Sequence, residues 1–238
     1  MINIKGKNAL ITGSSRGVGQ QIALGLAALG CNIIVHGRTL CNCKETLDLL
    51  KKYPVKVHAV YGELSEKSEI DNIIHQIRNL NIPVDILYNN AAIMRPYKED
   101  IFTHTWDDWQ ETFKVNVTAM YVLCAAFIPD MEENGFGRVI NTTSDIDAVP
   151  ELAPYGASKW AVDKLTYDLA SKYHNTPVRI NTFNPSWLQT DMGGADANNP
   201  VEAVLPGALG PVLIDDNGPN GRRFEALKPN KDFPLDSR

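Results

Sequence analysis

Two residues in the segment PYGASKW (154–160) could move a proton together. Tyr155 and Lys159 are four residues apart, so in a helix that begins near Pro154 their side chains would share one face. A free tyrosine has a pKa near ~10 and is a poor base at neutral pH. At about 6 Å and an effective dielectric constant of about 20, the ammonium would favour the phenolate by roughly 2.8 kcal/mol, or about two pKa units. Such a phenol could accept a proton from an alcohol or donate one to a carbonyl. On its own, this spacing is more typical of an ordinary pair on a helix surface.

A glycine-rich turn near the N-terminus could bind phosphate. The segment TGSSRGVG places Gly13, Gly17 and Gly19 between a predicted strand and a predicted helix. Glycines allow a tight turn and let backbone N–H groups approach a pyrophosphate, while the helix N-terminus adds partial positive charge. The spacing is G-x-x-x-G-x-G, which differs from the G-x-G-x-x-G dinucleotide fingerprint. The turn therefore predicts a dinucleotide site, with a purely structural strand-to-helix turn as the alternative.

Two arginines suggest which dinucleotide would bind. An acidic residue at the end of the second predicted strand would bind a ribose 2′-hydroxyl and favour NAD. The segment VHGRT (35–39) has no acid and contributes Arg38, while Arg16 lies in the glycine turn itself. Guanidinium groups suit a 2′-phosphate because they bind it bidentately. The sequence thus predicts NADP(H) as the preferred cofactor, with NAD(H) possible; the alternative is that both arginines are solvated surface residues.

The elements that must position these residues alternate between strand and helix. Short apolar runs predict strands at 8–12, 32–37, 56–64, 84–90, 138–144 and 179–185. Amphipathic stretches predict helices at 19–30, 39–53, 65–80, 106–133 and 154–174. This alternation predicts an α/β, doubly wound Rossmann fold, with a parallel sheet of about seven strands and helices on both faces. We expect one domain over 1–238, with an irregular helix at 201–214, an edge strand at 221–227 and a loose or docked tail at about 227–238.

Composition and charge exclude several classes of protein. The 238 residues carry a net charge of −5 without a basic stripe, so nucleic acid is not an expected partner. We find no apolar run of 18 residues and no signal-peptide layout, so we expect a cytoplasmic protein that does not span a membrane. Neither the four cysteines nor the five histidines have metal-ligand spacing, so no metal site is expected.

Six motifs occur together and in order. They are TGSSRGVG (12–19), NNAA (89–92), KVNVTA (114–119), INTTS (140–144), YGASK (155–159) and NPSWLQT (184–190). Over residues from about 5 to 192, this set resembles the short-chain dehydrogenase/reductase family of the classical type. The resemblance implies a single-domain Rossmann fold that transfers a hydride between NAD(P) and an alcohol or carbonyl carbon.

The resemblance also implies roles for four catalytic residues. Tyr155 would be the general acid/base, and Lys159 would lower its pKa and bind the nicotinamide ribose. Ser144 would orient the substrate oxygen, and Asn116 would hold a water that links Lys159 to solvent. The residues implied in cofactor binding are Gly13, Ser15, Arg16, Gly17, Val18, Gly19, Arg38, Glu63, Leu64, Asn90, Ala91, Ala92, Tyr155, Lys159, Pro185, Leu188 and Thr190.

The sequence departs from the family pattern at several places. Ala92 and Ser186 stand where the family commonly has glycine, and the change at Ser186 could stiffen the nicotinamide loop. Ser144 precedes Tyr155 by eleven residues, where twelve or thirteen is usual. The substrate lid is short, as in carbonyl-reductase-like members of the family, and a hinge at 193–194 could move it.

The substrate is the least determined feature. The residues expected near the pocket are Met94, Arg95, Tyr97, Asp145, Ile146, Asp147 and Trp187. Asp145 and Asp147 would disfavour an anion and could bind hydroxyls, which predicts a small carbonyl compound or a polyol; the alternative is that these acids simply face water. A 3-oxoacyl-thioester reductase and a non-catalytic dinucleotide-sensing protein remain as alternative functions. The acidic segment DMEEN (130–134) weighs lightly against an acyl-carrier-protein substrate.

The resemblance also implies a homodimer or homotetramer that pairs through the long helices. The residues that could serve such a face, or the core instead, are Ala125, Phe127, Trp160 and Leu165.

Overall fold

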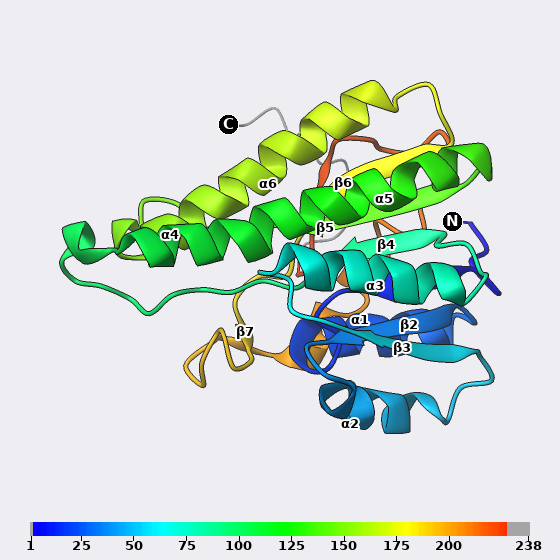
Figure 1. The fold of residues 1–238 in the computed structure, drawn as a ribbon, viewed down its shortest axis with the longest axis horizontal. Helices are drawn as coiled ribbons and strands as arrows, with labels where there is room; N and C mark the ends of the chain where they lie inside the picture. Colours follow the sequence, from blue (N-terminus) through cyan, green and yellow to red (C-terminus); the bar gives the residue numbers. More distant parts are fainter. Residues whose placement is uncertain (1, 228–238) are drawn as a thin grey trace.

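A seven-stranded sheet forms the centre of the protein, whose computed structural model describes residues 2–227 (Figure 1). The strand order is β3-β2-β1-β4-β5-β6-β9, and all six pairings are parallel. The strands are β1 (Asn8–Ile11), β2 (Asn32–Gly37), β3 (Val57–Tyr61), β4 (Ile86–Asn89), β5 (Gly137–Thr142), β6 (Val178–Asn184) and β9 (Arg223–Glu225). The strand order reverses between β1 and β4, which is where doubly wound folds bind their ligands. The predicted Rossmann fold and its seventh, edge strand are confirmed.

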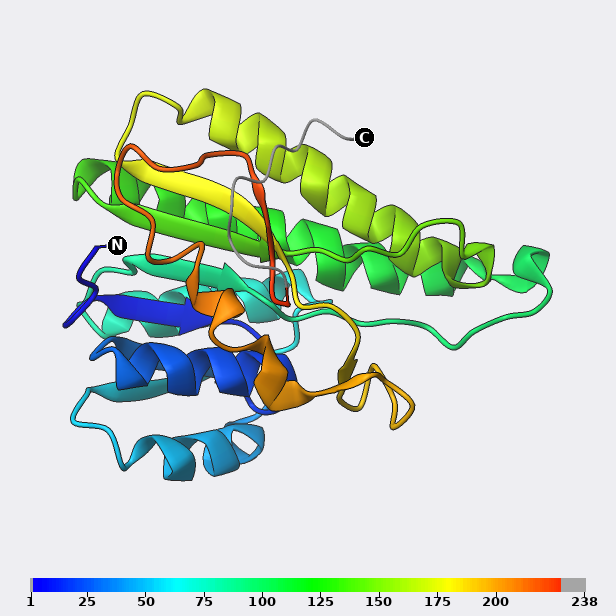
Figure 2. The same ribbon diagram turned by 180° about the vertical axis from the view of Figure 1, so that it is seen from behind.

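Helices cover both faces of the sheet because alternate strand residues are apolar on each side. Ile11 and Val35 pack with α1 (Gly17–Ala28) and α2 (Leu40–Leu50), on the face seen in Figure 2. Leu10 and Ile34 point to the opposite face, seen in Figure 1. That face carries α3 (Lys67–Asn79), α4 (Trp106–Phe113), α5 (Met120–Glu133) and α6 (Ala153–Lys172).

The predicted continuous helix at 106–133 is interrupted. A π-helical turn, η2 (Lys114–Ala119), separates α4 from α5. Such turns are rare in proteins, and those that occur are often found at functional sites. By length and composition the stretch Trp106–Glu133 could cross a membrane, and half of its most apolar window is buried inside the fold.

The chain after β6 differs most from the prediction. The expected helix at 201–214 is replaced by two 3₁₀ turns, η4 (Val201–Val204) and η5 (Gly207–Leu209), because Pro206 lies between them and lacks a backbone donor. A small two-stranded sheet pairs β7 (Leu188–Gln189) with β8 (Asn199–Pro200). The tail expected at about 227–238 lies outside the described residues except for Leu227.

Candidate active site

The glycine turn between β1 and α1 is packed too closely to hold side chains. Gly13 and Gly17 have φ values of +63° and +59°, in the left-handed region that favours glycine. A Cβ on Gly19 would lie 2.5 Å from the Gly13 carbonyl oxygen and 2.6 Å from Asn90 Nδ2. The first backbone N–H groups of α1 have no partner within the helix, and the Arg16 side chain does not cap them. The turn therefore fits a pyrophosphate, which would accept from these amides.

The NNAA segment forms a wall beside this turn. Asn90 Nδ2 donates to the carbonyl oxygens of Thr12 and Gly13, at 3.0 and 3.3 Å. The backbone N–H groups of Asn90 and Ala91 both donate to Thr12 Oγ1 at 3.0 Å. The structure thus brings Asn90 and Ala91 against Gly13, and Ala92 follows half-buried.

The two arginines lie in different surroundings. Arg38 follows β2 and is exposed. Arg16 Nε lies 3.0 Å from Asp191 Oδ2, and both side chains are mostly exposed, at 65% and 72%. Arg16 therefore bridges the glycine turn to the loop after β7. Glu63, half-buried, and Leu64, buried, follow β3 at the sheet edge beside Arg38.

Tyr155 and Lys159 lie together in the first turns of α6, and both are buried, with exposed fractions of 9% and 3%. Lys159 Nζ lies 5.5 Å from the centroid of the tyrosine ring and donates to the Thr142 carbonyl oxygen at 2.8 Å. The Ser144 side chain interacts with the Tyr155 phenol and, against the larger effect of burial, lowers its pKa. An ammonium has three N–H donors, and Thr142 accepts one, so Lys159 could also donate to a ribose hydroxyl.

Burial has the largest effect on both titrating groups. It raises the pKa of Tyr155 to about 12, and the interaction with Ser144 opposes this increase. It lowers the pKa of Lys159 to about 8, and the negative charge of Asp163 opposes that decrease. The expectation that Lys159 depresses the pKa of Tyr155 below its usual value is therefore not met in the protein alone. The sequence argument counted the attraction between the two groups and left out their desolvation.

Asn116 fixes the π-helical turn to its neighbours. Its Oδ1 accepts from the Ile93 N–H at 2.8 Å, and its Nδ2 donates to the Ile93 carbonyl oxygen and to Ser158 Oγ, both at 2.9 Å. Both protons of the amide are thus used within the protein. A relay water at this residue would therefore have to donate to one of its oxygens, because the amide has no proton left to give. These partners, 23 and 42 residues away in the chain, gave no signal in the sequence.

Asp145 follows Ser144 but turns toward the edge of the sheet. One carboxylate oxygen pairs with Arg223 Nη2, and the other accepts from Asn184 Nδ2 at 2.8 Å. Arg223 Nε also donates to Glu225 Oε1 at 2.8 Å, within β9. Arg223 and Asn184 each engage one carboxylate oxygen, while the Asp145 side chain is 57% exposed and therefore also faces water. Arg223 is the partner that the sequence did not reveal.

The loop expected at the nicotinamide and the segment expected to form the lid are held by their own hydrogen bonds. Ser186 has a φ of +69°, which explains why the family has glycine there, and its N–H donates to Asn184 Oδ1 at 3.0 Å. The N–H groups of Gly193 and Gly194 donate to Thr190 Oγ1 and Thr190 O, at 3.0 and 2.8 Å. The two glycines of the predicted hinge thus lie in a hydrogen-bonded turn.

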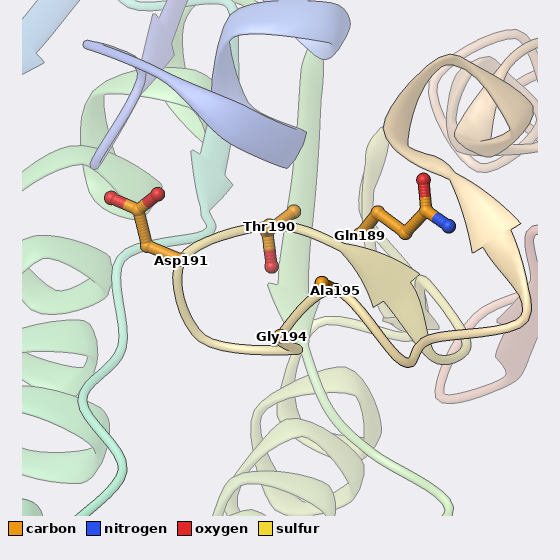
Figure 3. A pocket seen from close by; sticks show the side chains of 5 residues that line it. All are labelled: Gln189, Thr190, Asp191, Gly194 and Ala195. Atoms are coloured by element: carbon orange, nitrogen blue, oxygen red, sulfur yellow. The ribbon is translucent and has the colours of Figure 1, made fainter.

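A pocket of about 360 Å³ lies in this loop and is drawn in Figure 3. It is lined by Gln189, Thr190, Asp191, Gly194 and Ala195. Pro185 and Leu188 precede it, and Leu188 is buried in the core. Within residues 2–227 no group of acidic, cysteine and histidine side chains could hold a metal ion.

Comparison with known proteins agrees with this geometry. The family model for short chain dehydrogenases matches residues 7–200. The chain is 30% identical to the 5-keto-D-gluconate 5-reductase of Escherichia coli K12, over 81% of this chain and 76% of that protein. It is 31% identical to the 3-oxoacyl-[acyl-carrier-protein] reductase of Aquifex aeolicus, over 80% of this chain and 77% of that protein.

A solved structure shares both the fold and part of the sequence. The L-sorbose reductase of Gluconobacter frateurii, complexed with NADPH and L-sorbose, superposes with a TM-score of 0.74 at 29% identity, over 79% of this chain and 72% of that one. Together with the match to the family model, these relatives establish the class of the protein. The chain belongs to the short-chain dehydrogenase/reductase family, whose members are NAD(P)-dependent oxidoreductases that act on alcohol and carbonyl groups.

Proposed function

We propose that this protein reduces the carbonyl group of a polyhydroxylated compound, such as a keto sugar or a sugar acid, with NADPH. The observation that carries the proposal is the arrangement of Ser144, Tyr155 and Lys159 at the carboxyl edge of the sheet. Two of the relatives are, by name, a 5-ketogluconate reductase and an L-sorbose reductase. A small carbonyl compound or polyol is the substrate class that both names share.

The chain's own groups suit proton donation. When bound, NADPH supplies the hydride. Tyr155, whose pKa burial raises to about 12, stays protonated at neutral pH and donates its phenol proton to the carbonyl oxygen. The Ser144 hydroxyl orients that oxygen, and the Lys159 ammonium stabilises the phenolate left behind. Asn116 holds the π-helical turn and would accept from a relay water through one of its oxygens.

The cofactor preference rests on charge near the adenosine end. β2 ends in His36 and Gly37 without an acidic residue, and Arg38 follows at the surface. Arg16 is the residue directly before α1, and its guanidinium could bind a 2′-phosphate in place of the Asp191 carboxylate. NADP(H) is therefore the preferred cofactor, and NAD(H) binds more weakly.

The test is a substrate panel with both cofactors. NADPH absorbance is followed with 5-keto-D-gluconate, L-sorbose, simple aldehydes and acetoacetyl-coenzyme A, and then with NADH. Tyr155→Phe should lower kcat at least 100-fold and leave the NADPH dissociation constant within about twofold. Tyr167→Phe, on the exposed side of α6, is the matched control. A Tyr155→Phe variant with most of its activity would refute the assignment. Tight NADPH binding without turnover of any compound would favour the sensing protein.

A 3-oxoacyl-thioester reductase is the second candidate. The observation in its favour is the 31% identity to the Aquifex aeolicus enzyme. The acidic segment at 130–134 offers no basic docking surface for an acidic carrier protein. Faster turnover of acetoacetyl-coenzyme A than of the sugars would select this candidate.

The assembly is proposed to be a homodimer or homotetramer, in the cytoplasm. Aromatic side chains are exposed on the long helices, among them Tyr121 on α5 and Trp160 on α6. Phe127, suggested by the sequence for such a face or for the core, is in the core with 3% exposed. Light scattering of the purified protein measures the state, and a monomer at micromolar concentration would contradict the proposal.

A further inference from the structure

His36 occupies the end of β2 and uses both ring nitrogens within the protein. Its Nδ1 lies 3.1 Å from the N–H of Gly13, the first glycine of the cofactor turn. Its Nε2 lies 3.2 Å from the carbonyl oxygen of Gly62, which follows β3. The side chain is buried, with 2% exposed. One imidazole therefore connects the carboxyl ends of three neighbouring strands, β1, β2 and β3 (Figure 1).

The two partners determine the protonation of the ring. The Gly13 N–H is a donor, so Nδ1 must offer its lone pair, and the Gly62 carbonyl is an acceptor, so Nε2 must carry the proton. Only the neutral imidazole satisfies both. Burial favours this form, because it lowers the pKa of His36 to about 4.

The backbone of His36 is tied to the same turn. Its N–H donates to Ser14 Oγ, and its carbonyl oxygen accepts from the Ser14 N–H, both at 3.0 Å. The first two amides of the turn are thus used by His36. The following amides, from the start of α1, are the ones left to face a phosphate.

The ring also connects two segments that are expected to contact the cofactor. On one side is the glycine turn, which is closely packed: a Cβ on Gly13 would lie only 3.0 Å from the Ala91 Cα. On the other side, Gly62 leads directly into Glu63 and Leu64, the segment expected at the adenine. A change in the ring would alter the distance between these two sides.

We propose that His36 is a positioning residue for cofactor binding: its neutral imidazole fixes the glycine turn against the segment 62–64 and so aims the turn amides at the pyrophosphate. This goes beyond the Tyr155 chemistry and rests on the proposed dinucleotide site alone. It predicts a defect in binding of ligands that contain the pyrophosphate and adenine together, with the chemical step unaffected.

The test compares three variants by calorimetry and kinetics. His36→Leu removes both ring contacts, His36→Asn keeps an acceptor near the Nδ1 position, and His75→Leu, on the exposed side of α3, is the control. The ligands are NADPH, 2′-phospho-ADP-ribose, which keeps the pyrophosphate, and reduced nicotinamide mononucleotide, which lacks the adenosine half.

His36→Leu should weaken NADPH and 2′-phospho-ADP-ribose by 10-fold or more, and leave the mononucleotide within twofold. His36→Asn should recover at least half of the affinity that His36→Leu loses, measured on a logarithmic scale. In both His36 variants, kcat at saturating NADPH should stay within threefold of the wild type. Two results would show a general structural role and overturn the proposal. One is equal weakening of all three ligands. The other is a His36→Asn variant whose NADPH affinity differs from that of His36→Leu by no more than the error of the control. Wild-type NADPH affinity in His36→Leu would also overturn the proposal.

A second measurement does not need a folded variant. In the wild-type protein at pH 7, ring nitrogen NMR shifts of His36 should show a protonated Nε2 and an unprotonated Nδ1. The opposite tautomer or a charged ring would overturn the proposal. The calorimetric titrations and the NMR measurement are independent of turnover, so a protein that binds NADPH but reduces no sugar would refute the proposed function and leave the role of His36 standing.

Discussion

Lys159 keeps its charge in a buried position, and this should cost the folded protein stability. Burial lowers its pKa from 10.5 to about 8, which corresponds to about 3 kcal/mol against the charged form. Lys159→Met removes the charge with little change in volume. It also leaves the Thr142 carbonyl without its donor, a loss of about 1–3 kcal/mol. At pH 7 the two effects nearly cancel, so the variant should be at least as stable as the wild type while kcat falls at least 100-fold.

The sharper test is the dependence on pH. Below pH 8 both the folded and the unfolded protein hold the Lys159 proton, so the full cost is present. Between pH 8 and 10.5 the unfolded chain binds one proton more than the folded protein, so this contribution to stability rises with pH. From pH 7 to 9.5 the rise due to Lys159 amounts to about 2 kcal/mol. The Met variant lacks this component.

The assay is urea unfolding at pH 7 and at pH 9.5. From pH 7 to pH 9.5, the free energy of unfolding should rise by about 2 kcal/mol more in the wild type than in Lys159→Met. The buried thiols of Cys31 and Cys124, whose pKa burial raises to about 12, contribute equally to both proteins and cancel. Lys164→Met, at an exposed position of the same helix, is the control and should show no such difference. A difference below about 0.5 kcal/mol would refute a desolvated Lys159.

Three other outcomes follow from the site. Ser186→Gly should raise the free energy of unfolding by about 1 kcal/mol in urea titrations, because it relieves a left-handed φ of +69°; lower stability would contradict this. Asp191→Asn should tighten NADPH two- to fivefold in fluorescence titrations and leave NADH unchanged, because it removes the carboxylate that holds Arg16; equal effects on both cofactors would count against a 2′-phosphate role. The pH profile of kcat/KM for NADPH should fall above about pH 8 as Lys159 loses its proton, and a flat profile to pH 9.5 would exclude that explanation.

The sheet and the helices around it could be predicted because each depends on a local pattern. Alternating apolar runs fix the strands, and the glycine turn and the Tyr155–Lys159 spacing depend on residues within one or two turns of each other. The π-helical turn could not be predicted in this way. Its Asn116 bonds to Ile93, which lies in the loop after β4, so the sequence around 116 alone predicts a regular helix.

The same reasoning explains why charges were harder to predict than elements. Asp145 is neutralised by Arg223, which is 78 residues away and joins the site only when β9 completes the sheet. The sign of the Tyr155 shift depended on how deeply α6 packs, which spacing does not report. Interactions within one element could be estimated from the sequence, whereas burial is a property of the assembled fold.

Burial acts in the same direction on His36 and Lys159 and gives them opposite charge states. It lowers the pKa of His36 from 6.5 to about 4 and that of Lys159 from 10.5 to about 8. Between these two values His36 is neutral and can accept from Gly13, while Lys159 is charged and can stabilise a phenolate. The same physical effect, desolvation, therefore has two outcomes because the intrinsic pKa values of the two groups differ. It leaves a neutral imidazole that bridges the cofactor turn and a lysine that is still charged at the site of proton transfer.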